Sequence, residues 1–147
     1  MTRPKHMRMR ENTILRVAAK SLLPFFFLFA FYVQFHGDFG PGGGFQAGVI
    51  FAAGVVLYGL IYGVDAAKAV IPKPWVEVGV ALGVLIWIAT GVATMLEGGR
   101  YLEYGKLDVA HPVHGQHLGI LFVEFGVLMA VASGMTLIFY LFAERGR

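Results

Sequence analysis

The chain has 147 residues, of which 57% are hydrophobic and only 14% are charged. These values leave too few polar side chains to cover a water-soluble globule, so the composition excludes a soluble enzyme and indicates a membrane protein. The absence of cysteine excludes disulfides, thiolate metal sites and thiol catalysis. The formal net charge of +3 does not indicate nucleic-acid binding, because the basic residues are divided among several segments and form no single stripe.

Four long apolar runs predict four transmembrane helices. Crossing a hydrocarbon core about 30 Å thick takes roughly 20 apolar residues per helix. The runs extend from about Val17 to Phe35, from Phe45 to Val64, from Trp75 to Leu96 and from Leu118 to Phe142. The segments between them are too short for a soluble domain with its own core. We therefore expect one all-α integral membrane domain over residues 1–147, with short loops.

The distribution of basic residues predicts that both termini lie in the cytoplasm (N-in, C-in). If the first helix runs outward, ten of the twelve Lys and Arg residues fall on the inner side. Only Arg100 and Lys106 fall on the outer side, where three acids accompany them. No small-x-small cleavage site follows the first apolar run before Phe35-His36, so we expect a retained helix rather than a signal peptide.

Small residues predict where the helices pack closely. Gly44 with Gly48 and Gly79 with Gly83 form GxxxG pairs, a spacing that lets helix backbones approach in lipid. In the last apolar run, at 100° per residue, one stripe contains small residues and the nearly opposite face carries His117 and Glu124. The stripe consists of Gly115, Gly119, Gly126, Ala130 and Ser133. A bundle of four helices does not easily satisfy both faces internally, so we expect obligate membership of a complex.

Glu124 is the carboxylate that falls deepest inside a predicted span, about six residues from the outer end of the last helix. An ionised acid in the middle of a membrane helix costs about 2.5–3.5 kcal/mol on insertion scales, so such residues face a partner or a water-filled cavity and often relay ions. A protonated Glu124 in an interhelical hydrogen bond is the structural alternative. Glu77, near the inner start of the third helix, is better explained by the positive helix end.

Histidines gather on the predicted outer side. His111, His114 and His117 enter the last helix at i, i+3, i+6 spacing, and His36 ends the first helix. Histidine changes its protonation near physiological pH, so His114 or His117 beside Glu124 would suit a proton or cation path. Metal ligation, or haem ligation with His36 as one axial ligand, is a less favoured alternative because no cysteine contributes and Pro112 interrupts the cluster. We therefore predict no metal and no cofactor.

Two segments resemble a known family. LLPFFFLFAFYVQFHGDFGPGGGFQAGVIFAAG, from Leu22 to Gly54, is similar to the B subunit of Mrp-type (Mnh) cation/proton antiporters, in which an LLPF helix leads into PGGGFQxG. HPVHGQHLGILFVEFGV, from His111 to Val127, resembles the last helix of that family, with a glutamate two residues before a glycine. In this sequence the turn and packing motif corresponds to Pro41, Gly42, Gly43, Gly44, Gln46 and Gly48.

The resemblance implies a four-helix accessory subunit of a Na⁺/H⁺ antiporter in the cell membrane, and not an enzyme. Its partners would be the six other Mrp subunits, A, C, D, E, F and G, with Na⁺ and H⁺ as the transported ions. By the same resemblance, proton translocation belongs mainly to subunits A and D, and this chain contributes to assembly and to an ion path in which Glu124 matches the motif glutamate. Related subunits of membrane-bound hydrogenases and similar redox complexes, and a haem-bearing membrane anchor, are the alternatives.

Overall fold

The computed structural model describes residues 12–37 and 40–145, and this part of the chain is all-helical. Four helices are long and apolar enough to cross a membrane: α1 Thr13–His36, α2 Gly44–Tyr62, α4 Lys73–Leu96 and α5 Pro112–Arg145. Two short elements join them, α3 Val64–Val70 and the 3₁₀ helix η2 Tyr104–Lys106. The prediction of an all-α chain with four membrane-spanning helices is confirmed, whereas the N-in, C-in orientation stays a prediction.

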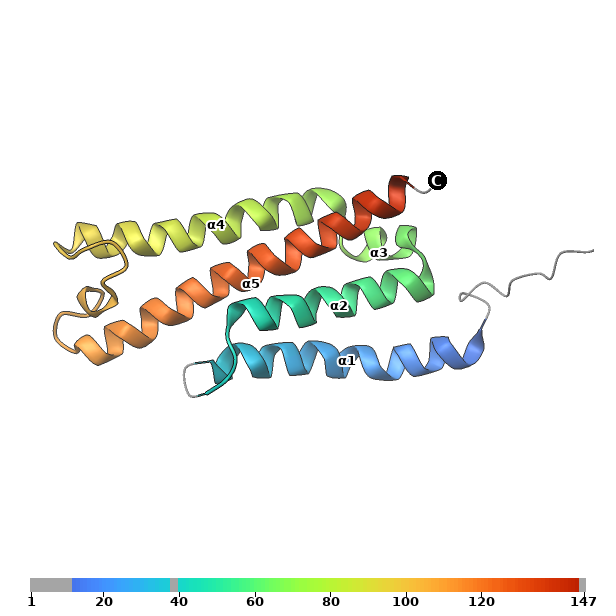
Figure 1. The fold of residues 1–147 in the computed structure, drawn as a ribbon, viewed down its shortest axis with the longest axis horizontal. Helices are drawn as coiled ribbons and strands as arrows, with labels where there is room; N and C mark the ends of the chain where they lie inside the picture. Colours follow the sequence, from blue (N-terminus) through green and yellow to red (C-terminus); the bar gives the residue numbers. More distant parts are fainter. Residues whose placement is uncertain (1–11, 38–39, 146–147) are drawn as a thin grey trace, which may run out of the picture.

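The four long helices lie side by side in the order α4, α5, α2, α1, which differs from their order along the chain (Figure 1). Helix α5 packs against both α4 and α2, and α1 packs mainly against α2. Helix α5 has 34 residues and is therefore about 51 Å long at 1.5 Å per residue. It is the element that joins the two halves of the bundle.

Glycines bring the helix backbones into contact where α5 crosses its neighbours. A Cβ on Gly83 of α4 would lie 2.5 Å from the backbone nitrogen of Ala130 and from the carbonyl oxygen of Gly126. On the other side of α5, a Cβ on Gly44 would lie 2.0 Å from the carbonyl oxygen of Glu124. Neither position has room for a methyl group, so both interfaces depend on glycine.

Helix α1 begins before the expected Val17. The side chain of Asn12 caps it by accepting hydrogen bonds from the backbone nitrogens of Ile14 (3.1 Å) and Leu15 (3.3 Å). Helix α2, in contrast, ends at Tyr62 rather than Val64 because Gly63 has a φ of +99°, which breaks the helix. The chain then turns into α3, an element that the apolar pattern does not predict.

Helix α5 begins at Pro112, six residues before the expected Leu118. Proline suits a first helical turn because it has no N–H to leave unpaired. The carboxylate of Asp108 also accepts a hydrogen bond of 3.0 Å from the backbone nitrogen of His111, which fixes the chain just before the helix. The early start places His114 and His117 inside the first two turns of α5.

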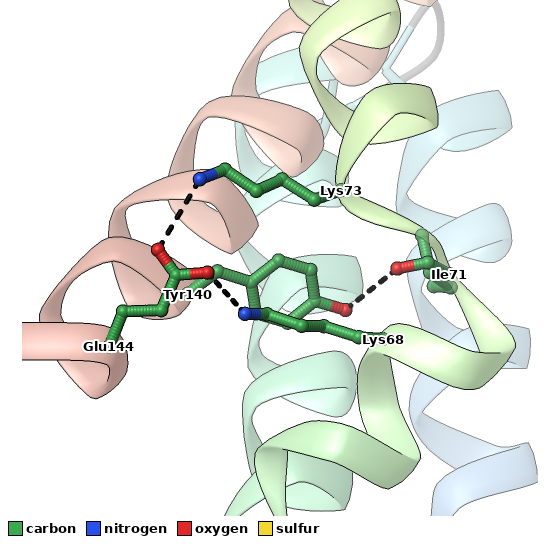
Figure 2. Close-up of polar contacts among 5 residues, drawn as sticks. All are labelled: Lys68, Ile71, Lys73, Tyr140 and Glu144. Atoms are coloured by element: carbon green, nitrogen blue, oxygen red, sulfur yellow. Dashed lines mark hydrogen bonds and ion pairs between the residues drawn. The ribbon is translucent and has the colours of Figure 1, made fainter. Parts of the chain in front are cut away.

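Side chains from α3 and α4 fasten the C-terminal end of α5 (Figure 2). Lys68 and Lys73 both pair with Glu144, the latter at 3.3 Å. The hydroxyl of Tyr140, a residue with no exposed surface, donates a 3.0 Å hydrogen bond to the carbonyl oxygen of Ile71. The segment that joins α2 to α4 is therefore held against α5 by ion pairs and by a hydrogen bond from a buried side chain.

Candidate functional site

Glu124 meets the turn that joins α1 and α2. It is half-buried, and it lies twelve residues after Pro112, or about 18 Å along α5 at 1.5 Å per residue. The estimate of six residues from the helix end is therefore too short. Helices α4 and α5 extend beyond the turn between α1 and α2 (Figure 1), so Glu124 lies level with the end of the α1–α2 pair and some way along α5.

The turn holds Glu124 closely through its glycines. A Cβ on Gly37 would lie 2.9 Å from Oε1 of Glu124, and a Cβ on Gly43 would lie 3.0 Å from the same atom. Gly43 also has a φ of +116°, a backbone conformation that L side chains rarely adopt. We call Gly37, Gly43 and Gly44 the glycine cradle, because they surround the carboxyl group and the backbone of Glu124.

The cradle is fixed to the end of α1 by backbone hydrogen bonds. The nitrogen of Gly43 donates to the carbonyl oxygen of Val33 at 3.1 Å, and a Cβ on Gly42 would lie 2.6 Å from that oxygen. Of the other predicted turn and packing residues, Gly48 faces Val131 of α5, whereas Pro41 and Gln46 are exposed. The motif therefore divides into glycines that contact neighbouring helices and two exposed residues, Pro41 and Gln46.

A cavity of about 230 Å³ lies beside Glu124, between the end of α1 and the first turns of α5. It is lined by Gln34, Phe35, His114, His117, Leu118, Leu121 and Glu124. The structure thus brings the three predicted ion-path residues, Glu124, His117 and His114, to one cavity. Their role in ion movement stays a prediction.

Gln34 is a polar residue of this site that the sequence reasoning missed. Only 3% of it is exposed, and among the described residues neither its Nε2 nor its Oε1 has a hydrogen-bond partner. Buried amides are nearly always paired, so a pair of unsatisfied amide atoms on a cavity wall marks a place where a ligand, water or ion can bind. In the sequence, the feature that could have indicated Gln34 is a single amide side chain near the end of an otherwise apolar helix.

Asp108 is the second missed residue, and it connects the cavity to the segment between α4 and α5. Its Oδ2 lies 2.9 Å from Nδ1 of His114 and 3.9 Å from Nδ1 of His111. The hydrogen bond with the His114 side chain, followed by the one from the His111 backbone, holds the pKa of Asp108 below its usual range. His114 therefore has a carboxylate partner on one side and the cavity on the other.

The described residues show no group of three or more His, Cys, Asp or Glu side chains placed to hold a metal ion. His36 stacks on the ring of Tyr32, with centroids 5.3 Å apart, and the wall that α1 gives to the cavity consists of Gln34 and Phe35 instead. What the site offers is a carboxyl group, an amide and two imidazoles around a small cavity. Such a set can bind or pass a proton or a small monovalent cation.

The comparisons with known proteins agree with this architecture. Residues 14–137 match the family model described as a domain related to the MnhB subunit of Na⁺/H⁺ antiporters. Proteins of Staphylococcus aureus strains Newman, COL and JH1, provisionally named antiporter subunit mnhB2, are each 31% identical to this chain over 138 residues. Each alignment covers 87% of this chain and 97% of the relative. The match to the family model extends from the second residue of α1 into α5 and includes Gln34, the glycine cradle and Glu124. This chain therefore belongs to the MnhB family.

Proposed function

We propose that this chain is an accessory membrane subunit of a multisubunit Na⁺/H⁺ antiporter of the cell membrane. Its family and its relatives' names support a transport role rather than a catalytic one. In this proposal it assembles with the other Mrp subunits, A, C, D, E, F and G, with both termini in the cytoplasm. Large apolar side chains such as Phe25, Leu28 and Phe142 are more than 60% exposed in the single chain, which fits contact with lipid and with neighbouring subunits.

We also propose that Glu124, His117 and His114 lie on an ion path within that complex. The observation that carries this proposal is the shared cavity, because an acid within a membrane bundle can take part in ion movement only if ions or protons can reach it. Asp108 and His114 extend the polar contacts from the cavity to the outer connector. Protons or cations would thus enter from that side and reach the carboxyl group of Glu124.

The test is Na⁺/H⁺ exchange in everted vesicles that contain the assembled complex. Glu124→Gln keeps the shape of the side chain and replaces its titratable carboxyl group with an amide, so we expect normal assembly with a lower exchange rate or an altered pH dependence. Glu97→Gln is the matched control, because Glu97 is an exposed acid at the end of α4 and lies outside the cavity. An assembled Glu124→Gln complex with unchanged rate and pH dependence would exclude the ion path and leave only the assembly role.

A further inference from the structure

A groove of about 800 Å³ lies beside the other end of α1, away from the cavity at Glu124. Its walls come from the first half of α1 and the last turns of α2. Arg16 and Lys20 stand at its polar end, and Leu23, Phe27 and Tyr58 form its apolar part. These α1 residues recur every three or four positions, so they form one face of the helix.

Two exposed basic side chains stand at the polar end of the groove. Arg16 and Lys20 are both exposed, and the ion pairs of Glu144 and Asp108 are formed with other cations. Tyr62 holds Arg16 in place: its hydroxyl donates a 2.9 Å hydrogen bond to the carbonyl oxygen of Arg16, and its ring lies 5.7 Å from the guanidinium carbon. The groove therefore presents two cations, one of them positioned, to a ligand.

The apolar part of the groove continues deeper into the bundle. A second cavity of about 230 Å³ shares Leu23, Phe27 and Tyr58 with the groove and extends to Val70 and Ile71. No charged side chain lines this second cavity. A ligand that fills both spaces must have an anionic end at Arg16 and a long apolar part along Leu23 and Phe27.

We propose that this groove binds an anionic phospholipid, with its phosphate at Arg16 and Lys20 and an acyl chain along Leu23 and Phe27. Charge complementarity favours this occupant over a neutral lipid or an apolar protein helix, because neither would neutralise the two cations. The residues that precede α1 in sequence add charge of the same sign, namely Arg3, Lys5, Arg8 and Arg10. The site is independent of the proposed ion path.

The first experiment is native mass spectrometry of the purified full-length chain, titrated with phosphatidylglycerol or phosphatidylcholine that carry the same acyl chains. We expect tighter binding of phosphatidylglycerol. Arg16→Ala with Lys20→Ala should weaken that binding about 30-fold and leave phosphatidylcholine unchanged, since each cation near an anionic lipid contributes about 1 kcal/mol. Arg100→Ala with Lys106→Ala, which removes the same charge at the opposite end of the bundle, should have little effect.

Equal binding of the two lipids to the wild-type chain, or an equal loss in the control variant, would overturn the proposal. Displacement of phosphatidylglycerol by glycerol 1-phosphate at equal concentration would also overturn it, because the site would then recognise a small anion. If the Arg16/Lys20 variant does not fold, Val17→Trp keeps both cations and fills the groove that Val17 lines. That variant should bind less phosphatidylglycerol, and unchanged binding would refute the site.

A second experiment distinguishes a lipid from a protein occupant in native membranes. A photo-crosslinking side chain is introduced as Val17→p-benzoylphenylalanine, at a position that lines the groove and is 60% exposed. We expect the chain to form an adduct whose mass corresponds to an anionic phospholipid. An adduct with another protein would overturn the proposal and assign the groove to subunit contact.

Discussion

Replacing Gly44 by alanine tests whether the glycine cradle holds α2 against α5. The new Cβ would lie 2.0 Å from the carbonyl oxygen and 2.8 Å from the carbonyl carbon of Glu124. Both are backbone atoms, which cannot rotate away as a flexible side chain can. Since ordinary contacts begin at 3.4 Å, the two helices must separate by more than an ångström at this point. Overpacking usually costs about 1–3 kcal/mol, and we expect at least the upper end of that range here.

A loss of about 3 kcal/mol lowers the folded-to-unfolded ratio about 100-fold or more, which equilibrium unfolding followed by far-ultraviolet circular dichroism in detergent can detect. Gly134→Ala is the matched control in α5, because nothing lies within 4 Å of the Cβ it would add. That change should stabilise the helix by about 0.5–1 kcal/mol, the usual gain of alanine over glycine. The reasoning fails if Gly44→Ala is as stable as the wild-type chain or as the Gly134→Ala control.

Two further changes test the polar groups around the cavity. Gln34→Leu removes a buried amide that has no partner among the described residues, so the free energy of unfolding should rise by about 1–3 kcal/mol. Na⁺/H⁺ exchange by the assembled complex should fall in the same variant. A loss of stability would show instead that the amide is paired in the folded protein. Ionised Asp108 stabilises the N-terminal end of α5, and because its pKa is lowered in the folded protein, this stabilisation is fully present at pH values above the ordinary aspartate pKa of about 3.9. It is lost as the pH falls through the lower pKa of the folded protein. Hydrogen exchange at the amide of His111 should therefore be faster in Asp108→Asn than in the wild type at pH 6, and a difference that persists unchanged at the lowest pH would contradict this explanation.

The number and type of the long helices could be predicted because each depends on local composition. An apolar run of about 20 residues has few alternatives to a membrane helix, whatever surrounds it. Helix ends were harder to predict, since they depend on contacts that hydropathy does not contain. Asp108 fixes the start of α5 through a hydrogen bond, and the positive φ of Gly63 ends α2. A hydropathy pattern records neither of these features. The short α3 was missed for the same reason.

The candidate site divides in a similar way. His114, His117 and Glu124 all come from α5, and the last two lie on one face at helical spacing, so their proximity could be expected from a single segment. Gln34 lines the same cavity and the glycine cradle contacts Glu124, although both are about 80–90 residues from Glu124 in sequence. These contacts between distant segments depend on how α1, α2 and α5 pack. A single sequence shows which polar residues are present but not which helices bring them together.

The packing of α2 on α5 and the position of Glu124 are the same structural feature. The carboxyl group rests on Gly37 and Gly43, and the backbone of the same residue rests on Gly44, so any backbone shift at the turn also moves the acid. A cradle variant that lost transport would therefore not show whether assembly or the ion path had failed. Glu124→Gln and Gln34→Leu change side-chain chemistry and leave the backbone contacts in place. Only such variants, compared at equal amounts of assembled complex, separate the structural role of this region from its proposed role in ion movement.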